Sequence, residues 1–194
     1  MLAVWAETGL ILSDEFRDGN VPAMMNPLTA AKAAFGALPP TVETFYYRGD
    51  SASHEHELMD WYCNPEREDG PKGYIEEWTA AKRIQGHREK AGTAEMVHDV
   101  LKNELAAGVL PCGRFGANAA WLRLAVITHN VLTALKRLAL PKYLPARPKR
   151  LRFLFLNLAG RVSHHARTIR LRLATLFARI GDTVQAFEAL PIRV

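Results

Sequence analysis

Hydrophobic and polar positions in the first part of the chain follow the spacing of strands. Two apolar segments, LAVWA and LILSDEF, flank a short turn at residues 7–9 that contains a glycine, and this arrangement predicts a β-hairpin. An alanine-rich segment at 28–37 predicts a helix that ends before a Pro-Pro pair. The β-branched and aromatic run VETFYYR, residues 42–48, predicts a buried strand.

Helical spacing takes over after residue 50. Residues 51–62 begin with two serines that suit an N-cap and continue with an apolar side, so they predict a helix. Residues 63–75 are charged and rich in Pro and Gly, which predicts a loop. Residues 118–140 form a long and largely apolar segment closed by a proline, which predicts a long helix.

The segment between this loop and the long helix predicted over 118–140, residues 76–106, is mostly helical in pattern but contains glycines. We expect the helix to break near Gly86 and Gly92, with Thr93 as the N-cap of its second piece. Gly108 is suited to end that piece, because glycine readily adopts the left-handed conformation that terminates helices.

The end of the chain mixes basic and apolar positions. After a proline-broken basic linker at 141–150, residues 150–180 alternate the two types, at first with period two. This pattern predicts a strand, a glycine turn and a second strand or helix. The predicted order of strands and helices belongs to the α/β class, with a mixed sheet, flanking helices and a basic C-terminal β/α segment. We expect a boundary between residues 1–140 and 141–194.

Charge is distributed unevenly along the chain, whose formal net charge is +5. Residues 1–110 carry 10 Lys+Arg against 18 Asp+Glu, a balance of −8, whereas residues 111–194 carry 15 against 2, a balance of +13. A basic half of this kind predicts a surface for a polyanion, and nucleic acid is the partner we favour. The alternative is that the basic half only provides solubility or neutralises the acidic half.

Two classes of protein are disfavoured by the sequence. It has no apolar run of membrane-spanning length, and its apolar start lacks the basic residues of a signal peptide, so we expect neither membrane insertion nor export. Cys63 and Cys112 form no CxxC pair, and we expect reduced thiols in a cytosol. Residues 48–51 spell a cell-adhesion tetrapeptide, Arg-Gly-Asp-Ser, but adhesion would require export.

Three segments resemble one known family. YYRGDSASHEHELMDWY, HREKAGTAEMVHDVLKNELAAG and RFGANAAWLRLAVITHNVLTAL are similar to bacterial insertion-sequence transposases of the DDE class. The hairpin and the basic tail resemble that family too, so the likeness covers nearly the whole chain. It implies an incomplete RNase H-like sheet in residues 1–140, a basic segment in 141–194, and a cytoplasmic, nucleoid-associated protein.

The resemblance also implies roles for individual residues. Asp50 matches the second catalytic carboxylate and Glu95 the catalytic glutamate, and together they would hold Mg²⁺ or Mn²⁺. Lys102 matches a basic residue that contacts DNA. Glu95 and Lys102 are seven positions apart, close to two helical turns, so they share one face of the predicted helix. From spacing alone, Asp50 reads equally well as a turn residue, and Glu95 as a carboxylate favoured by the helix dipole.

Two departures from the family lower the expected activity. The family's first catalytic Asp lies on a strand before the hairpin, and no strand with an Asp lies upstream of Trp5. Only 44 residues separate Asp50 from Glu95, where relatives carry a long insertion. We therefore expect a truncated, internally shortened transposase whose strand transfer is lost or very poor, because two metal ions would lack a carboxylate that bridges them.

The basic positions give the second functional hypothesis. They are expected to neutralise phosphates of double-stranded DNA at transposon ends without reading its sequence. Two interpretations stay open: a transposase remnant with weak or no catalysis, and a non-catalytic DNA-binding protein that interferes with a full-length transposase, either as a homo-oligomer or in complex with it. The candidate DNA-contacting residues are Arg88, Lys102, Lys149, Arg150, Arg152, Arg161, Arg167, Arg170 and Arg172.

Overall fold

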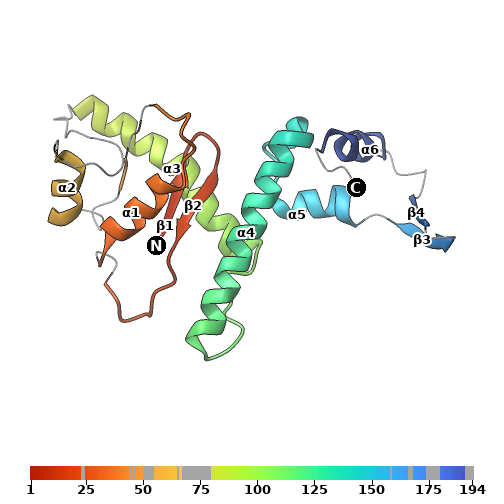
Figure 1. The fold of residues 1–194 in the computed structure, drawn as a ribbon, viewed down its shortest axis with the longest axis horizontal. Helices are drawn as coiled ribbons and strands as arrows, with labels where there is room; N and C mark the ends of the chain where they lie inside the picture. Colours follow the sequence, from red (N-terminus) through yellow and green to blue (C-terminus); the bar gives the residue numbers. More distant parts are fainter. Residues whose placement is uncertain are drawn as a thin grey trace. The chain divides into compact units, whose positions relative to one another are not determined.

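The chain divides into two compact units, Met1–Ile127 and Thr128–Val194, and each has its own hydrophobic core. Figure 1 shows the helices and strands of each unit. In the described part of the chain, no helix is both long enough and apolar enough to cross a membrane. The computed structural model describes residues 1–22, 25–43, 45, 47–49, 55–64, 66, 80–157, 159–165, 168–173 and 180–190.

The first unit begins with the predicted β-hairpin, which is confirmed. Strands β1 (Leu2–Trp5) and β2 (Leu10–Asp14) pair antiparallel. Gly9 in the turn has a φ of 71°, a left-handed conformation that costs glycine little. The amide of Gly9 donates to the Trp5 carbonyl at 2.7 Å and closes the turn.

Two short helices follow the hairpin. Helix α1 (Pro27–Gly36) confirms the predicted alanine-rich helix and packs against β1, β2 and α2. Helix α2 (His56–Cys63) confirms in part the helix predicted over residues 51–62, because it begins at His56, after an extended Glu55. The predicted N-cap serines, at positions 51 and 53, lie outside the described residues.

The strand predicted over residues 42–48 is wrong for its described residues, none of which pairs with another strand. The aromatic side chains pack on a helix instead. The ring centroid of Phe35 on α1 lies 5.9 Å from that of Phe45 and 6.4 Å from that of Tyr47. It also lies 6.0 Å from the ring of Trp61 on α2. The described aromatic side chains of this run, Phe45 and Tyr47, therefore contact rings on α1 and α2 rather than a neighbouring strand.

Helix α3 (Ala80–Asn103) is continuous, so the predicted breaks at Gly86 and Gly92 and the predicted N-cap at Thr93 are wrong. A glycine inside a helix costs only about 1 kcal/mol relative to alanine, and the burial of Val97, Val100 and Leu101 on the same helix outweighs that cost. The helix also ends at Asn103, five positions before the predicted Gly108. Ala106, with a φ of 59°, adopts the left-handed conformation in the turns that follow.

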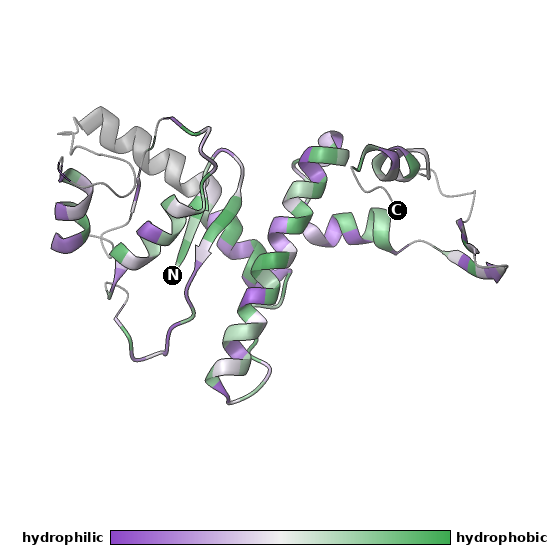
Figure 2. Cartoon of the chain, viewed as in Figure 1, coloured by the Kyte–Doolittle hydropathy of each residue, from purple (hydrophilic) through white to green (hydrophobic). Residues whose placement is uncertain are grey.

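Helix α4 (Phe115–Ala139) confirms the long helix predicted from the apolar segment. Its first half joins β2 and α3 in the core of the first unit, and Figure 2 shows most of the paired strands β1 and β2 in the hydrophobic colour. The buried residues of this core are Ile11, Val97, Leu101, Ala125 and Val126, against which Leu2, Val4, Leu105, Ala107 and Leu122 pack.

The second unit holds the rest of α4 and the basic tail. It contains a 3-10 turn, η2 (Pro141–Tyr143), and helix α5 (Pro148–Leu151), which continues into a π-helical turn, η3 (Arg152–Leu156). Strands β3 (Gly160–His165) and β4 (Thr168–Leu173) form an antiparallel ribbon, and helix α6 (Ile180–Ala189) follows.

The first strand predicted in the basic tail is wrong, because those residues form α5 and η3. Leu151 and Leu154 are three positions apart and both buried, so the alternating pattern also contained a helical repeat. The predicted glycine turn is wrong too, since Gly160 begins β3. The element predicted after that turn, a second strand or helix, is a strand pair, β3 and β4.

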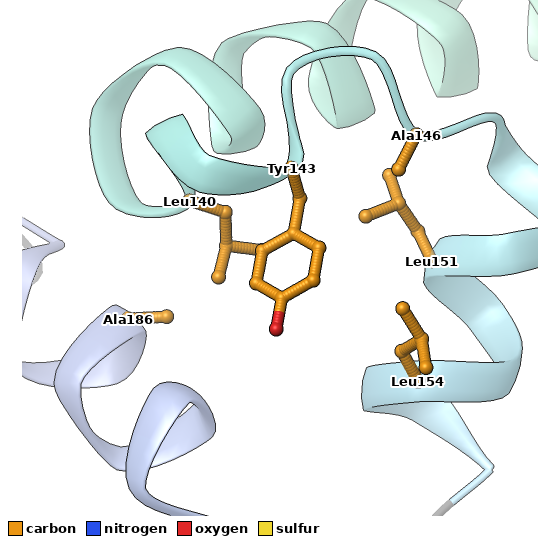
Figure 3. Packing of buried hydrophobic residues seen from close by; sticks show 6 residues of the cluster. All are labelled: Leu140, Tyr143, Ala146, Leu151, Leu154 and Ala186. Atoms are coloured by element: carbon orange, nitrogen blue, oxygen red, sulfur yellow. The ribbon is translucent and has the colours of Figure 1, made fainter. Parts of the chain in front are cut away.

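The core of the second unit gathers around Tyr143, as Figure 3 shows. The Tyr143 hydroxyl donates to Asp182 Oδ2 at 2.5 Å, which ties α6 to η2. Lys136 Nζ donates to the carbonyls of Leu144, at 3.1 Å, and Ala146, at 3.2 Å, and burial lowers the pKa of this lysine. The buried residues of this core are Leu140, Tyr143, Ala146, Leu151, Leu154 and Ala186.

The α/β class is confirmed. Each unit combines a small antiparallel sheet with helices, which is consistent with an incomplete α/β fold.

Candidate functional site

The candidate glutamate lies on the outward face of α3. Val97 and Leu101 are buried, with exposed fractions of 1% and 2%, and they face the core of the first unit. Glu95 and Lys102 are exposed and lie on the opposite side of the helix. Because α3 is continuous through this stretch, the two side chains share one face, two turns apart, as the sequence predicted.

The face between Glu95 and Lys102 carries further polar groups. His98 lies one turn from Lys102, and partial burial, together with the positive charge of Lys102, lowers the pKa of His98. The Asp99 carboxylate accepts a hydrogen bond from the Asn103 amide, which orients it along the helix. The face is therefore a solvated surface of mixed charge, where a glutamate stays accessible to a partner.

The second candidate carboxylate, Asp50, lies outside the described residues. Among the residues that the structure describes, no group of three His, Cys, Asp or Glu side chains comes together. The described residues therefore do not by themselves form the divalent-metal site that the family resemblance implies, and Glu95 is the one candidate ligand that they place.

Sequence reasoning missed an ion pair in the first unit. Asp14 ends strand β2, and its Oδ2 atom is buried and accepts no hydrogen bond. Arg123 Nε, on α4, lies 3.4 Å from this oxygen, so the ion pair links the end of β2 to α4. No signal in the sequence links two residues so far apart, because only the packing of β2 with α4 brings them together.

The β3–β4 ribbon presents arginines on one face. Arg161 pairs directly with Arg172, and Ser163 with Arg170. Opposite residues, and residues two apart in a strand, point to the same face, so these three arginines share it. All three are exposed. Val162 occupies the other face, with 66% of its surface exposed.

The positive charges of the facing arginines are not balanced by acidic residues in the surrounding sequence. Like charges directly opposite each other destabilise a strand pair. No Asp or Glu occurs anywhere between Leu105 and Gly181, a stretch that contains 14 Lys and Arg residues. An anion bound between the guanidinium groups of the two arginines would relieve this repulsion.

The other candidate DNA-contacting residues are placed in part. Lys149 and Arg150 on α5 and Arg152 on η3 are exposed. Arg88 lies on α3, but its side chain is outside the described part of the structure. Arg167 falls outside the described residues.

Comparison with known proteins gives one match. The family model described as transposase DDE domain group 1 matches residues 75–191, more than half of the chain. This stretch contains Glu95, Lys102 and the ribbon, whereas Asp50 lies before it. Searches of curated proteins and of solved structures found no match. On the family match, the chain belongs to the family of transposase DDE domains, group 1.

Proposed function

We propose that this transposase-family protein binds double-stranded DNA, at transposon ends, through the basic surfaces of its second unit, and that it cleaves DNA weakly or not at all. The observation that carries the proposal is the arginine face of the ribbon, where Arg161 and Arg172 face each other and Arg170 lies beside them. DDE transposases act at transposon ends and generally use divalent metals.

The ribbon suits the sugar–phosphate backbone. Neighbouring strands lie about 4.8 Å apart, so the guanidinium groups of facing arginines reach the same region of a polyanion. Duplex DNA carries one negative charge per about 1.7 Å of helix axis, and each neutralised phosphate releases counterions. Arginine forks bind phosphate in bidentate fashion without reading the base sequence. Binding should therefore weaken steeply with salt.

Catalysis is proposed to rest on Asp50 and Glu95, with Mg²⁺ or Mn²⁺. Phosphodiester chemistry with two metal ions needs several carboxylates, one of which bridges the ions. The resemblance assigns only these two residues of the chain to that role. We therefore expect at most a weakly held ion and poor strand transfer.

The DNA-binding proposal is tested by fluorescence anisotropy with a labelled duplex, titrated from about 50 to about 200 mM salt. Replacing both facing arginines, Arg161→Gln/Arg172→Gln, should lower the affinity and reduce the slope of log K against log salt by about 2. The matched control is Lys32→Gln/Arg48→Gln, which removes two exposed cations from the first unit. An affinity that does not change with salt, or equal losses in the two double variants, would show that the ribbon does not bind DNA.

A second candidate function is that of a non-catalytic DNA-binding protein that interferes with a full-length transposase. The location of the ribbon favours it, because its arginines belong to the second unit and Glu95 to the first. Nicking assays with Mg²⁺ separate the two candidates. Divalent-dependent nicking that disappears in Asp50→Asn supports residual catalysis, whereas metal-independent binding that Asp50→Asn leaves intact supports the interfering protein.

A further inference from the structure

The outer face of the helical segment formed by α5 and η3 combines cations with exposed apolar side chains. Phe153 has 69% of its surface exposed and Leu156 has 64%. Lys149 lies four positions before Phe153, and Arg152 four before Leu156, so each apolar side chain has a cation about one turn away. Both cations are exposed as well.

Other residues of the same segment, on its inner face, supply the core, so core packing does not explain why position 153 is a phenylalanine. Leu151 and Leu154 are buried in the core of the second unit. Phe155 packs its ring edge-on against Tyr143, with the ring centroids 4.9 Å apart. The core is thus supplied by these residues, and Phe153 lies outside it, in a basic surrounding.

The backbone of this segment is also unusual. The amide of Asn157 donates to the Arg152 carbonyl at 2.8 Å, a π-helical bond that spans five residues. Single π-helical turns are rare and occur frequently at functional sites, because they shift side chains relative to a regular α-helix. Here the turn carries both exposed apolar side chains and Arg152.

We propose that Phe153 and Leu156 form a stacking platform for an unpaired DNA base, with Lys149, Arg150 and Arg152 holding the adjoining phosphates. Proteins that bind unpaired strands combine aromatic rings, on which bases stack, with cations that follow the backbone. The inference rests on the proposed function, since it assumes a DNA ligand, and it adds that unpaired bases next to a duplex are part of that ligand.

Charge favours this occupant over an apolar protein surface. The platform belongs to the stretch from Leu105 to Gly181 that has no acidic residue. A second copy of this chain docking the same face would bring like charges together, which costs energy. A nucleic acid strand instead supplies negative charge and an aromatic base at once.

The experiment compares two labelled DNA molecules that carry equal numbers of phosphates, a blunt duplex and a duplex with an unpaired overhang. The wild-type protein should prefer the overhang, and Phe153→Ala should reduce that preference by about tenfold, the scale of one base–aromatic stack. Phe153→Trp should keep the preference, whereas Phe153→Leu, which keeps apolar volume without a π-face, should lose it. A 5-iodouracil in the overhang should photo-crosslink to Phe153.

The matched control is Val184→Ala, which truncates an exposed apolar side chain of the same unit in a helix whose first turn is acidic. It should keep the overhang preference. An unchanged preference in Phe153→Ala, or a preference retained by Phe153→Leu, overturns the platform while salt-sensitive duplex binding persists. Loss of self-association in Phe153→Ala without any base preference would make the patch a protein interface. Failure of the wild-type protein to bind either DNA overturns both proposals.

Discussion

At the scale of residues, the titration of His98 on α3 makes the stability of the fold depend on pH. Its pKa in the folded protein lies below the ordinary value of 6.5, because burial and the nearby Lys102 both disfavour the protonated ring. Between that lowered pKa and 6.5 the unfolded chain binds more protons than the folded one, so stability increases with pH in this window. Below this window the protonated His98 lowers the free energy of unfolding by its full amount. Above the window His98 is neutral in both states and does not change the free energy of unfolding.

The prediction is that the free energy of unfolding decreases from about pH 7.5 to about pH 5, and that His98→Gln makes this decrease smaller. Lys102→Gln should also make it smaller, because it removes one of the two causes of the shift. Urea unfolding at the two pH values measures both effects. If the decrease is as large in His98→Gln as in the wild-type protein, His98 does not contribute to it.

Individual residues also show which parts of the site were readable from sequence. Glu95 and Lys102 share a face because helical periodicity alone determines it. The Asp14–Arg123 ion pair could not be predicted, because it depends on how β2 packs with α4. The exposure of Phe153 and the burial of Phe155 were equally hidden, since a π-helical turn sets their directions rather than an alternating strand.

At the scale of elements, Gly92 offers a test of how α3 holds together. A Cβ atom added at Gly92 would meet nothing within 4 Å, and the residue lies inside a regular helix. Gly92→Ala should therefore raise the free energy of unfolding by about 0.5–1 kcal/mol, through the lower backbone entropy of the unfolded chain. Thermal and urea unfolding both measure this gain.

Gly108→Ala is the matched control for Gly92→Ala. A Cβ at Gly108 would lie 3.2 Å from the carbonyl oxygen of Lys102, so its gain should be smaller or reversed. A loss of stability in Gly92→Ala would instead mean that the glycine is needed for the local conformation of α3.

The elements that sequence reasoning placed wrongly share one physical cause. Local patterns predicted a strand at 42–48 and another after residue 150, but a strand needs a neighbour with which to pair. Phe45 and Tyr47 instead pack their rings against the ring of Phe35 on helix α1. The glycine positions in α3 were predicted to break a helix that packing keeps intact. Long apolar segments such as α4, in contrast, were identified correctly because their periodicity extends over many turns.

At the scale of the whole molecule, the charge asymmetry is the sequence feature on which the proposed DNA contact rests, because the basic excess falls within residues 111–194. Packing adds a second division, because each unit encloses its own core. All four tryptophans belong to the first unit, so their fluorescence reports its unfolding alone. Circular dichroism reports the helices of both units.

This difference in reporters makes the coupling between the two cores measurable. Leu154→Ala removes a buried side chain from the second core and should destabilise it by about 2–5 kcal/mol, the usual cost of such a cavity. If the cores unfold separately, Leu154→Ala should shift the unfolding midpoint seen by circular dichroism and leave the midpoint seen by tryptophan fluorescence unchanged. Leu101→Ala in the first core should shift the fluorescence midpoint. We expect this outcome, because none of the buried residues in either core belongs to the other unit. Coincident shifts in both signals for Leu154→Ala would show instead that the two units unfold as one cooperative structure.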